Sequence, residues 1–170
     1  MDLFVKNPNL GFVSCNAIIA NEKTKEERPH KISRYEKSEV FENIMAHDYM
    51  GSGSGMVYKK SVFGGVGLFD ENLRSSQDRE MRIRLTQKYE FDFIDEPLFK
   101  YYVHDENRSK VLGVTGKEMD HDYILNKYVD YYKKHPKIYS NKLRYDGTRY
   151  MLVGSTGKAR RSFAKSINLN

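Results

Sequence analysis

The feature that most constrains the fold is a short apolar run near the start of the chain, GFVSCNAIIA at residues 11–20. It is rich in β-branched residues and is bounded by the polar triplets NPN and NEK, a pattern typical of a buried strand. Only ten residues precede it. A glycine-rich phosphate loop or a complete strand–helix–strand unit is therefore not expected on its N-terminal side.

The rest of the chain alternates between strand and helix patterns, which predicts the α/β class: a mixed sheet with flanking helices and a closing helical segment. Residues 77–88 have helical spacing. The run YEFDFIDEPLFKYYVH at 89–104 predicts two short strands broken by DEP. The remaining predicted elements are a polar loop at 22–31, a short strand in HKISRY, a helix after Ser38, a strand at MVY, a helix at 116–135 that Pro136 ends, and a helical pair over 137–170.

Composition places the chain among soluble globular proteins, since 39% of its residues are apolar and 31% are charged. No apolar run approaches the roughly 20 residues that span a bilayer, and the N-terminal MDLFVKNPNL lacks the pattern of a signal peptide. Cys15 is the only cysteine, which excludes an internal disulfide and a CxxC metal site. We therefore expect a cytoplasmic protein.

Charge is unevenly distributed along the chain, whose formal net charge is +6. Residues 123–170 contain 11 Lys and Arg but only two acids, whereas residues 1–122 contain 18 basic and 21 acidic residues. We accordingly divide the chain into a body at residues 1–112 and a basic, tyrosine-rich helical extension at residues 113–170. Such an extension can attract phosphates, nucleic acid or an anionic membrane, or its cations can be ordinary solvated helix faces.

Asp78 stands in the first turn of the predicted helix and admits two interpretations. In the structural one, the carboxylate interacts with the helix dipole, worth about 0.3–1 kcal/mol, pairs with Arg82 four residues on, and completes a capping box with Ser75. In the functional one, it lies at the rim of a cleft beside the glycine-rich loop GSGSG and removes a proton from a bound hydroxyl group. General bases of this kind accelerate reactions by roughly 10²–10⁴-fold.

Residues from about 8 to 110 carry an ordered series of motifs. The loop and strand GSGSGMVYKK precede the turn Gly67-Leu68-Phe69-Asp70-Glu71, and Gln77-Asp78 then opens a helix that ends in Arg84-Leu85. Further on, Pro97 precedes Tyr101-Tyr102-Val103-His104, with Asn107 and Ser109 nearby. This series resembles the second half of the nucleotide-sugar-binding domain of family 2 glycosyltransferases, which have a GT-A type fold.

The resemblance implies an enzyme that transfers a sugar from a nucleotide-sugar to the hydroxyl group of a glycan or lipid-linked acceptor. Asp78 would be the catalytic base, and His104 would be a ligand of the divalent metal. The acceptor side would be lined by Gly51, Ser52, Gly53, Ser54, Gln77 and Arg84. Gln77 stands where the family usually has glutamate, which removes one negative charge beside the base.

The family also carries an N-terminal half whose Asp-x-Asp motif binds Mg²⁺ or Mn²⁺, and this chain begins beyond that point of the pattern. Its own Asp-x-Asp, Asp120-His121-Asp122, has a helical context and is expected at a helix N-terminus instead of at a metal site. We therefore expect an acceptor-side half with little or no activity alone. Its expected partners are a missing N-terminal half or a second copy, with peripheral contact at the inner membrane face.

The alternative to a transferase is a non-catalytic binding module whose basic C-terminal segment holds nucleic acid, a membrane or a partner transferase. The chain has no RNP, KH, zinc or helix-turn-helix signature, so nucleic acid is not the expected partner. The two interpretations differ at Asp78, because a scaffold tolerates Asp78→Asn whereas a transferase loses turnover and keeps its fold.

Overall fold

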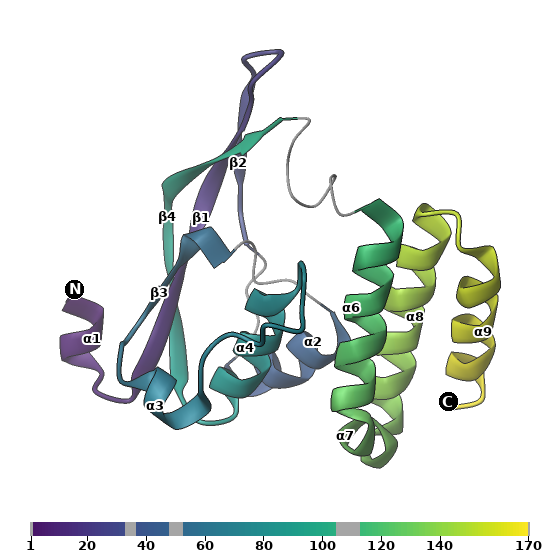
Figure 1. The fold of residues 1–170 in the computed structure, drawn as a ribbon. Helices are drawn as coiled ribbons and strands as arrows, with labels where there is room; N and C mark the ends of the chain where they lie inside the picture. The colour runs from purple at the N-terminus through teal and green to yellow at the C-terminus, as the bar shows by residue number, and fades with distance from the viewer. Residues whose placement is uncertain (1, 33–36, 48–52, 105–112, 170) are drawn as a thin grey trace.

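A four-stranded mixed sheet lies beside a set of helices in the part of the chain that the computed structural model describes, residues 2–32, 37–47, 53–104 and 113–169 (Figure 1). The presence of both strands and helices confirms the α/β class. Strands come from the N-terminal two thirds of the chain, and residues from Gly113 onward are helical.

Strand β1 (Leu10–Asn21) is the centre of the sheet, because each of the other described strands pairs with it. β4 (Glu90–Val103) runs parallel to β1 along its whole length. The opposite edge of β1 is shared by two antiparallel strands, β3 (Met56–Tyr58) beside residues 12–14 and β2 (Glu27–His30) beside residues 17–20. The predicted strands at residues 11–20 and at MVY are thus confirmed.

Two strand predictions were wrong. Residues 90–103 form one strand in place of two, because the register shifts from Ile94, opposite Cys15, to Pro97, opposite Asn16. This bulge accommodates the DEP break without ending the strand. Residues 27–30, predicted as loop, form the exposed strand β2, which main-chain pairing with β1 holds in place. Of the predicted strand HKISRY, at residues 30–35, His30 is the last residue of β2 and Lys31 and Ile32 are not in a strand, while residues 33–35 lie outside the described residues.

The helices follow the predicted pattern with one break. α2 (Val40–Ala46) and α4 (Gln77–Thr86) lie where the sequence predicts helices. The predicted helix at 116–135 is two helices, α6 (Gly113–Lys127) and α7 (Val129–Lys134). Pro136 begins α8 (Pro136–Leu152), where its missing N–H group leaves no hydrogen bond unmade. The others are α1 (Asp2–Lys6), α3 (Val62–Val66) and α9 (Thr156–Ile167), and 3₁₀ turns occur at Lys37–Glu39 and Gly53–Gly55.

One continuous apolar core joins the sheet to the helices. The rings of Phe12 on β1 and Phe91 on β4 are stacked, with their centroids 5.5 Å apart. Met81, Ile83 and Leu85 of α4 are fully buried in the same core. Burying a side chain of this size contributes about 1.5–3 kcal/mol, so these residues fix α4, and with it Asp78, against the body of the protein.

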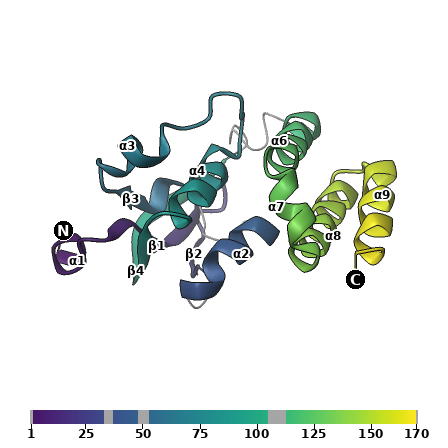
Figure 2. The ribbon, with the colours of Figure 1, turned by 90° about the horizontal axis from the view of Figure 1, so that it is seen from below.

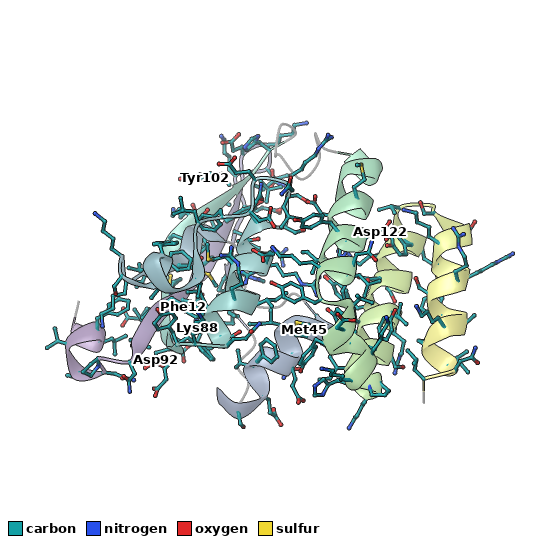
Figure 3. The ribbon with its side chains drawn as sticks, turned by 60° about the horizontal axis from the view of Figure 1, so that its bottom comes forward. Phe12, Met45, Lys88, Asp92, Tyr102 and Asp122 are labelled. Atoms are coloured by element: carbon teal, nitrogen blue, oxygen red, sulfur yellow. The ribbon has the colours of Figure 1, made fainter. Side chains whose placement is uncertain are left out.

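The C-terminal helices form a layer on the side of α2 and α4 that faces away from the sheet (Figure 2). Tyr132 of α7 is fully buried and donates a hydrogen bond of 2.8 Å to the Met45 carbonyl at the end of α2. Figure 3 shows Met45 at this junction. Residues on both sides of the predicted boundary at 112 therefore contribute to one core, and the division into two domains remains a prediction.

α9 packs along α8. The Phe163 ring lies over Gly147, so closely that a Cβ atom on that glycine would be 2.8 Å from the ring. Ser140 also donates a hydrogen bond of 3.0 Å to the Ser166 carbonyl. None of the helices in the described part of the chain is both long and apolar enough to cross a bilayer.

Candidate functional site

The candidate site centres on Asp78, the second residue of α4. Its Oδ2 atom accepts a hydrogen bond from the Gly53 backbone N–H at 3.1 Å, and its Oδ1 atom accepts one from the Arg79 N–H at 2.8 Å. The Arg82 guanidinium lies 3.6 Å from Oδ2, which confirms the predicted i,i+4 pair. The Asp78 side chain is 29% exposed. It is therefore held in place by donors on one side and reaches solvent on the other.

The predicted capping box does not form. The residue that caps α4 is Ser76, and it makes no capping hydrogen bond through its side chain. Ser75 instead donates its hydroxyl to Asp120 of α6, with 2.7 Å between Oγ and Oδ2. A buried carboxylate from a distant helix thus takes the partner that the local spacing assigned to Asp78.

Asp120 anchors the segment that leads into α4. It is 2% exposed, and besides the Ser75 hydroxyl it accepts the backbone N–H groups of Arg74 at 3.1 Å and Ser75 at 2.6 Å. Hydrogen bonds to an ionised group contribute roughly 1.5–3 kcal/mol each. The start of α4, where Asp78 lies, is therefore fixed by α6.

The prediction that Asp120-His121-Asp122 begins a helix was wrong, because α6 begins at Gly113 and these residues lie within it. The two carboxylates have separate partners. Asp122 accepts the Tyr150 hydroxyl at 2.8 Å and the Lys158 amine at 3.0 Å, on the side of the C-terminal helices (Figure 3). Among the described residues, no group of three His, Cys, Asp or Glu is arranged to hold a metal ion.

Arg84 joins the end of α4 to the turn at residues 67–71. It donates hydrogen bonds to the carbonyls of Val66 and Leu68, the latter at 2.8 Å, and forms a 2.8 Å ion pair with Glu80. Gly67 in this turn has φ of +81°, a conformation that favours glycine. Arg84 thus stabilises the turn through hydrogen bonds to its backbone carbonyls. That Arg84 contacts an acceptor remains a prediction.

Lys127 of α6 bridges the same turn and α4 from the other side. Its amine lies 2.6 Å from Asp70 and 2.8 Å from Glu80. The hydrogen bond from Lys127 is the main reason that the pKa of Asp70 lies well below its usual range. Burial, the largest single effect on Glu80, raises its pKa, but hydrogen bonds from Arg84, Lys127 and Tyr128 outweigh it and lower the pKa overall.

The other predicted site residues are placed as follows. Gln77 donates its side-chain amide to the Leu73 carbonyl at 2.7 Å, and Ser54 is exposed beside Gly53. His104 is half-buried and directly follows Val103, the last residue of β4. Gly51 and Ser52 lie outside the described residues. The structure thus brings together Gly53 and Asp78 from the predicted set.

The residues that sequence reasoning missed are those of α6 that hold the site, chiefly Asp120 and Lys127. Asp120 belongs to the Asp-x-Asp motif of the sequence, but that motif does not indicate a contact with Ser75. No motif marks Lys127, although Tyr123 and Lys127 share a helix face at i,i+4 spacing, and both contact Asp70, at 2.9 and 2.6 Å. No model of a known protein family matches the chain, and no curated protein matches it. The likeness to family 2 glycosyltransferases therefore remains a prediction made from the motifs.

Proposed function

We propose that this chain is the acceptor-side half of a glycosyltransferase with a partial GT-A type sheet, in which Asp78 is the catalytic base. The observation that carries the proposal is the position of the Asp78 carboxylate. It is partly exposed, lies at the start of a buried helix, and is aligned by the backbone N–H of the glycine-rich loop. Its three contacts are all with donors, which suit an ionised carboxylate.

The helix that carries Asp78 is held by contacts along its length, which supports a role in positioning a substrate. α4 is fixed by its buried apolar face, by Asp120 at its start, and by Arg84 near its end. A carboxylate has about four acceptor positions, so the contacts with Gly53 and Arg79 leave capacity for an incoming hydroxyl group. A held base contributes roughly 10²–10⁴-fold to the rate of such a step.

In the proposed reaction, the acceptor hydroxyl gives its proton to Asp78 while its oxygen forms a bond to the anomeric carbon of the sugar. The bond between that carbon and the diphosphate oxygen breaks, and the nucleoside diphosphate leaves with the electron pair. The described residues offer no ligand set that fits a divalent ion, so we assign no step to a metal within this chain. The donor and its metal would be held by a separate polypeptide.

Titration of the isotope-labelled chain by NMR tests the proposal. Oligosaccharides and soluble analogues of lipid-linked glycans are expected to shift the amide signals of Gly53 and Asp78. Nucleotide-sugars with Mg²⁺ are expected to leave these signals unchanged and to release no more nucleotide than the buffer does. Asp78→Asn should weaken the glycan response, whereas Asp130→Asn, a change at a side chain that is 87% exposed, should not.

Two outcomes would contradict the proposal in different ways. Robust metal-dependent nucleotide release by the chain alone would show that it is a complete enzyme and not a half. A response to oligonucleotides at α8 and α9, with none to any glycan at α4, would establish the non-catalytic binding module instead.

A further inference from the structure

A second group of charged residues lies at the junction of α2, α4, α6 and α8, on the side of α4 that faces the C-terminal helices. Its centre is Arg79, which is 1% exposed. One guanidinium nitrogen, Nη2, donates to the carbonyls of Ile44 and Met45 at 3.2 Å each. The other two, Nε and Nη1, are buried and have no hydrogen-bond partner among the residues that the structure describes. A buried polar group without a partner costs about 1–3 kcal/mol, and more when the group is charged.

The positive charge of Arg79 is not balanced by a nearby carboxylate among the described residues. Asp78 and Glu80, its neighbours on α4, are paired with Arg82 and Arg84. On α8, Asp146 is 2% exposed and forms an ion pair with Lys142. This pair is neutral as a whole, so the guanidinium of Arg79 is the excess charge of the group.

The positive charge of this group also lowers the pKa values of two histidines, His47 and His121. Burial is the main cause that lowers the pKa of His47, and the charges of Arg79 and Lys142 lower it further. Burial likewise lowers the pKa of His121, again with the help of Lys142 and Arg79, although Asp146 opposes this. His121 Nδ1 lies 3.1 Å from Asp146 Oδ1 without the alignment of a hydrogen bond. Both rings are therefore neutral near pH 7, and a neutral imidazole still offers one N–H donor.

Tyr145 of α8 lies close to all of these groups. Its ring centroid is 6.0 Å from the Arg79 guanidinium carbon and 5.9 Å from the Lys142 amine. The ring centroids of His47 and His121 are 5.8 and 6.2 Å away. Tyr145 and His47 are only half-buried, so they are the members of this group that solvent reaches.

We propose that Arg79, His47 and His121 form a binding site for a small oxyanion, a phosphate or carboxylate group that enters beside Tyr145. Such a group would accept hydrogen bonds from the unpaired guanidinium nitrogens and would balance the excess charge. Charge-assisted hydrogen bonds of this kind are roughly twice as strong as neutral ones. The site does not depend on Asp78 being a catalytic base, because Arg79 faces α8 while the Asp78 carboxylate faces Gly53.

The test is a titration of the purified chain with inorganic phosphate, sulfate and acetate at constant ionic strength, followed by the thermal midpoint and by the NMR signals of the histidines. At least one anion should raise the midpoint in a saturable, one-site manner and raise the pKa of His47 and His121. The anion that binds most tightly identifies the class, tetrahedral or carboxylate. Arg79→Met should weaken binding by about tenfold or more, since it removes the charge and the donors.

Two further variants keep the test decisive. Arg149→Gln removes the same charge from an exposed position of α8 and should leave the affinity unchanged. His47→Gln changes a half-buried residue of the proposed site and should weaken anion binding several-fold. This variant tests the proposal if Arg79→Met does not fold. The proposal is overturned if no anion gives a saturable response, or if Arg149→Gln weakens binding as much as the changes at Arg79 or His47.

Discussion

Replacing Asp120 with alanine tests whether α6 holds the start of α4. The carboxylate accepts three hydrogen bonds, from the Arg74 N–H, the Ser75 N–H and the Ser75 hydroxyl, and it is 2% exposed. At roughly 1.5–3 kcal/mol for each bond to a charged acceptor, the simple total exceeds 4 kcal/mol. Water that enters beside the partly buried loop will replace some of these bonds, so we expect a loss of about 4 kcal/mol in the free energy of unfolding.

Urea denaturation measures this loss. With a slope of about 2 kcal/mol per molar urea, typical of a chain of this size, the midpoint should fall by about 2 M. The matched control is Asp130→Ala, because Asp130 is 87% exposed and its lysine partner lies 3.9 Å away. That change should alter stability by no more than about 0.5 kcal/mol.

The result that refutes the reasoning is an Asp120→Ala midpoint close to that of Asp130→Ala. The loop before α4 would then be held by its own local structure, and the C-terminal helices would be accessory to the candidate site. If the reasoning is correct, the amide signal of Gly53 should also move in Asp120→Ala, because its acceptor, Asp78, lies on the helix that has lost its anchor.

Four further predictions follow from the structure. Asp78→Asn should keep the fold, judged by its urea midpoint, and in a reconstituted complete enzyme it should lower turnover by roughly 10²–10⁴-fold; unchanged turnover would contradict the assignment of the base. The free energy of unfolding should fall with decreasing pH in two stages. The first is below about pH 6.5, because the pKa of His121 is lowered in the folded chain and protonation favours the unfolded state. The second is below about pH 4.5, because the pKa values of Asp70 and Glu80 are lowered in the folded chain. Urea midpoints from pH 7 to 3 measure this, and Lys127→Met should flatten only the second stage. Gly147→Val should destabilise the chain by about 1–3 kcal/mol, because the new side chain collides with Phe163. Gly157→Ala is the control, because the space at Gly157 is open, and it should stabilise α9 by up to about 1 kcal/mol. Equal effects of the two changes would show that α9 does not pack as described. Arg79→Met should raise the pKa of His47 in an NMR titration without added anion, since it removes a charge that lowers that pKa.

The elements that sequence predicts well are those whose cause is local. β1 is a short apolar run with polar ends, so it is recognisable in its own window of sequence. α4 has Met81 and Leu85 at i,i+4, the spacing that predicts a helix, although its buried apolar residues Met81, Ile83 and Leu85 also alternate along the chain. The charged residues of α4 are a different matter. Arg79, Glu80 and Arg82 are at most 1% exposed, although a charged helix face is normally solvated. They are buried because α4 is covered from the sheet side and from α6 and α8 at once.

The same limit explains the missed part of the candidate site. Ser75 and Asp78 have the spacing of a capping box, and within that window the prediction is sound. It fails because Asp120, 45 residues away in the chain, presents a buried carboxylate to Ser75. A partner at such a separation leaves no periodic signal near Ser75, so the contact can be found only once the helices are placed in space.

The net charge of the C-terminal segment, counted from the sequence, overstates the positive charge that the folded chain exposes. Lys127, Lys142 and Lys158 are paired with carboxylates, and two of these pairs join α6 to other elements. The cations that remain exposed on α7, α8 and α9 are Lys133, Lys134, Lys137, Arg144, Arg149, Arg160, Arg161 and Lys165. Part of the predicted positive field is therefore used to hold the helices together. These exposed cations are numerous enough to contact several phosphates, so a nucleic acid that binds this surface should lose affinity steeply as salt is raised. A salt titration of oligonucleotide binding therefore separates the binding-module alternative from the transferase proposal.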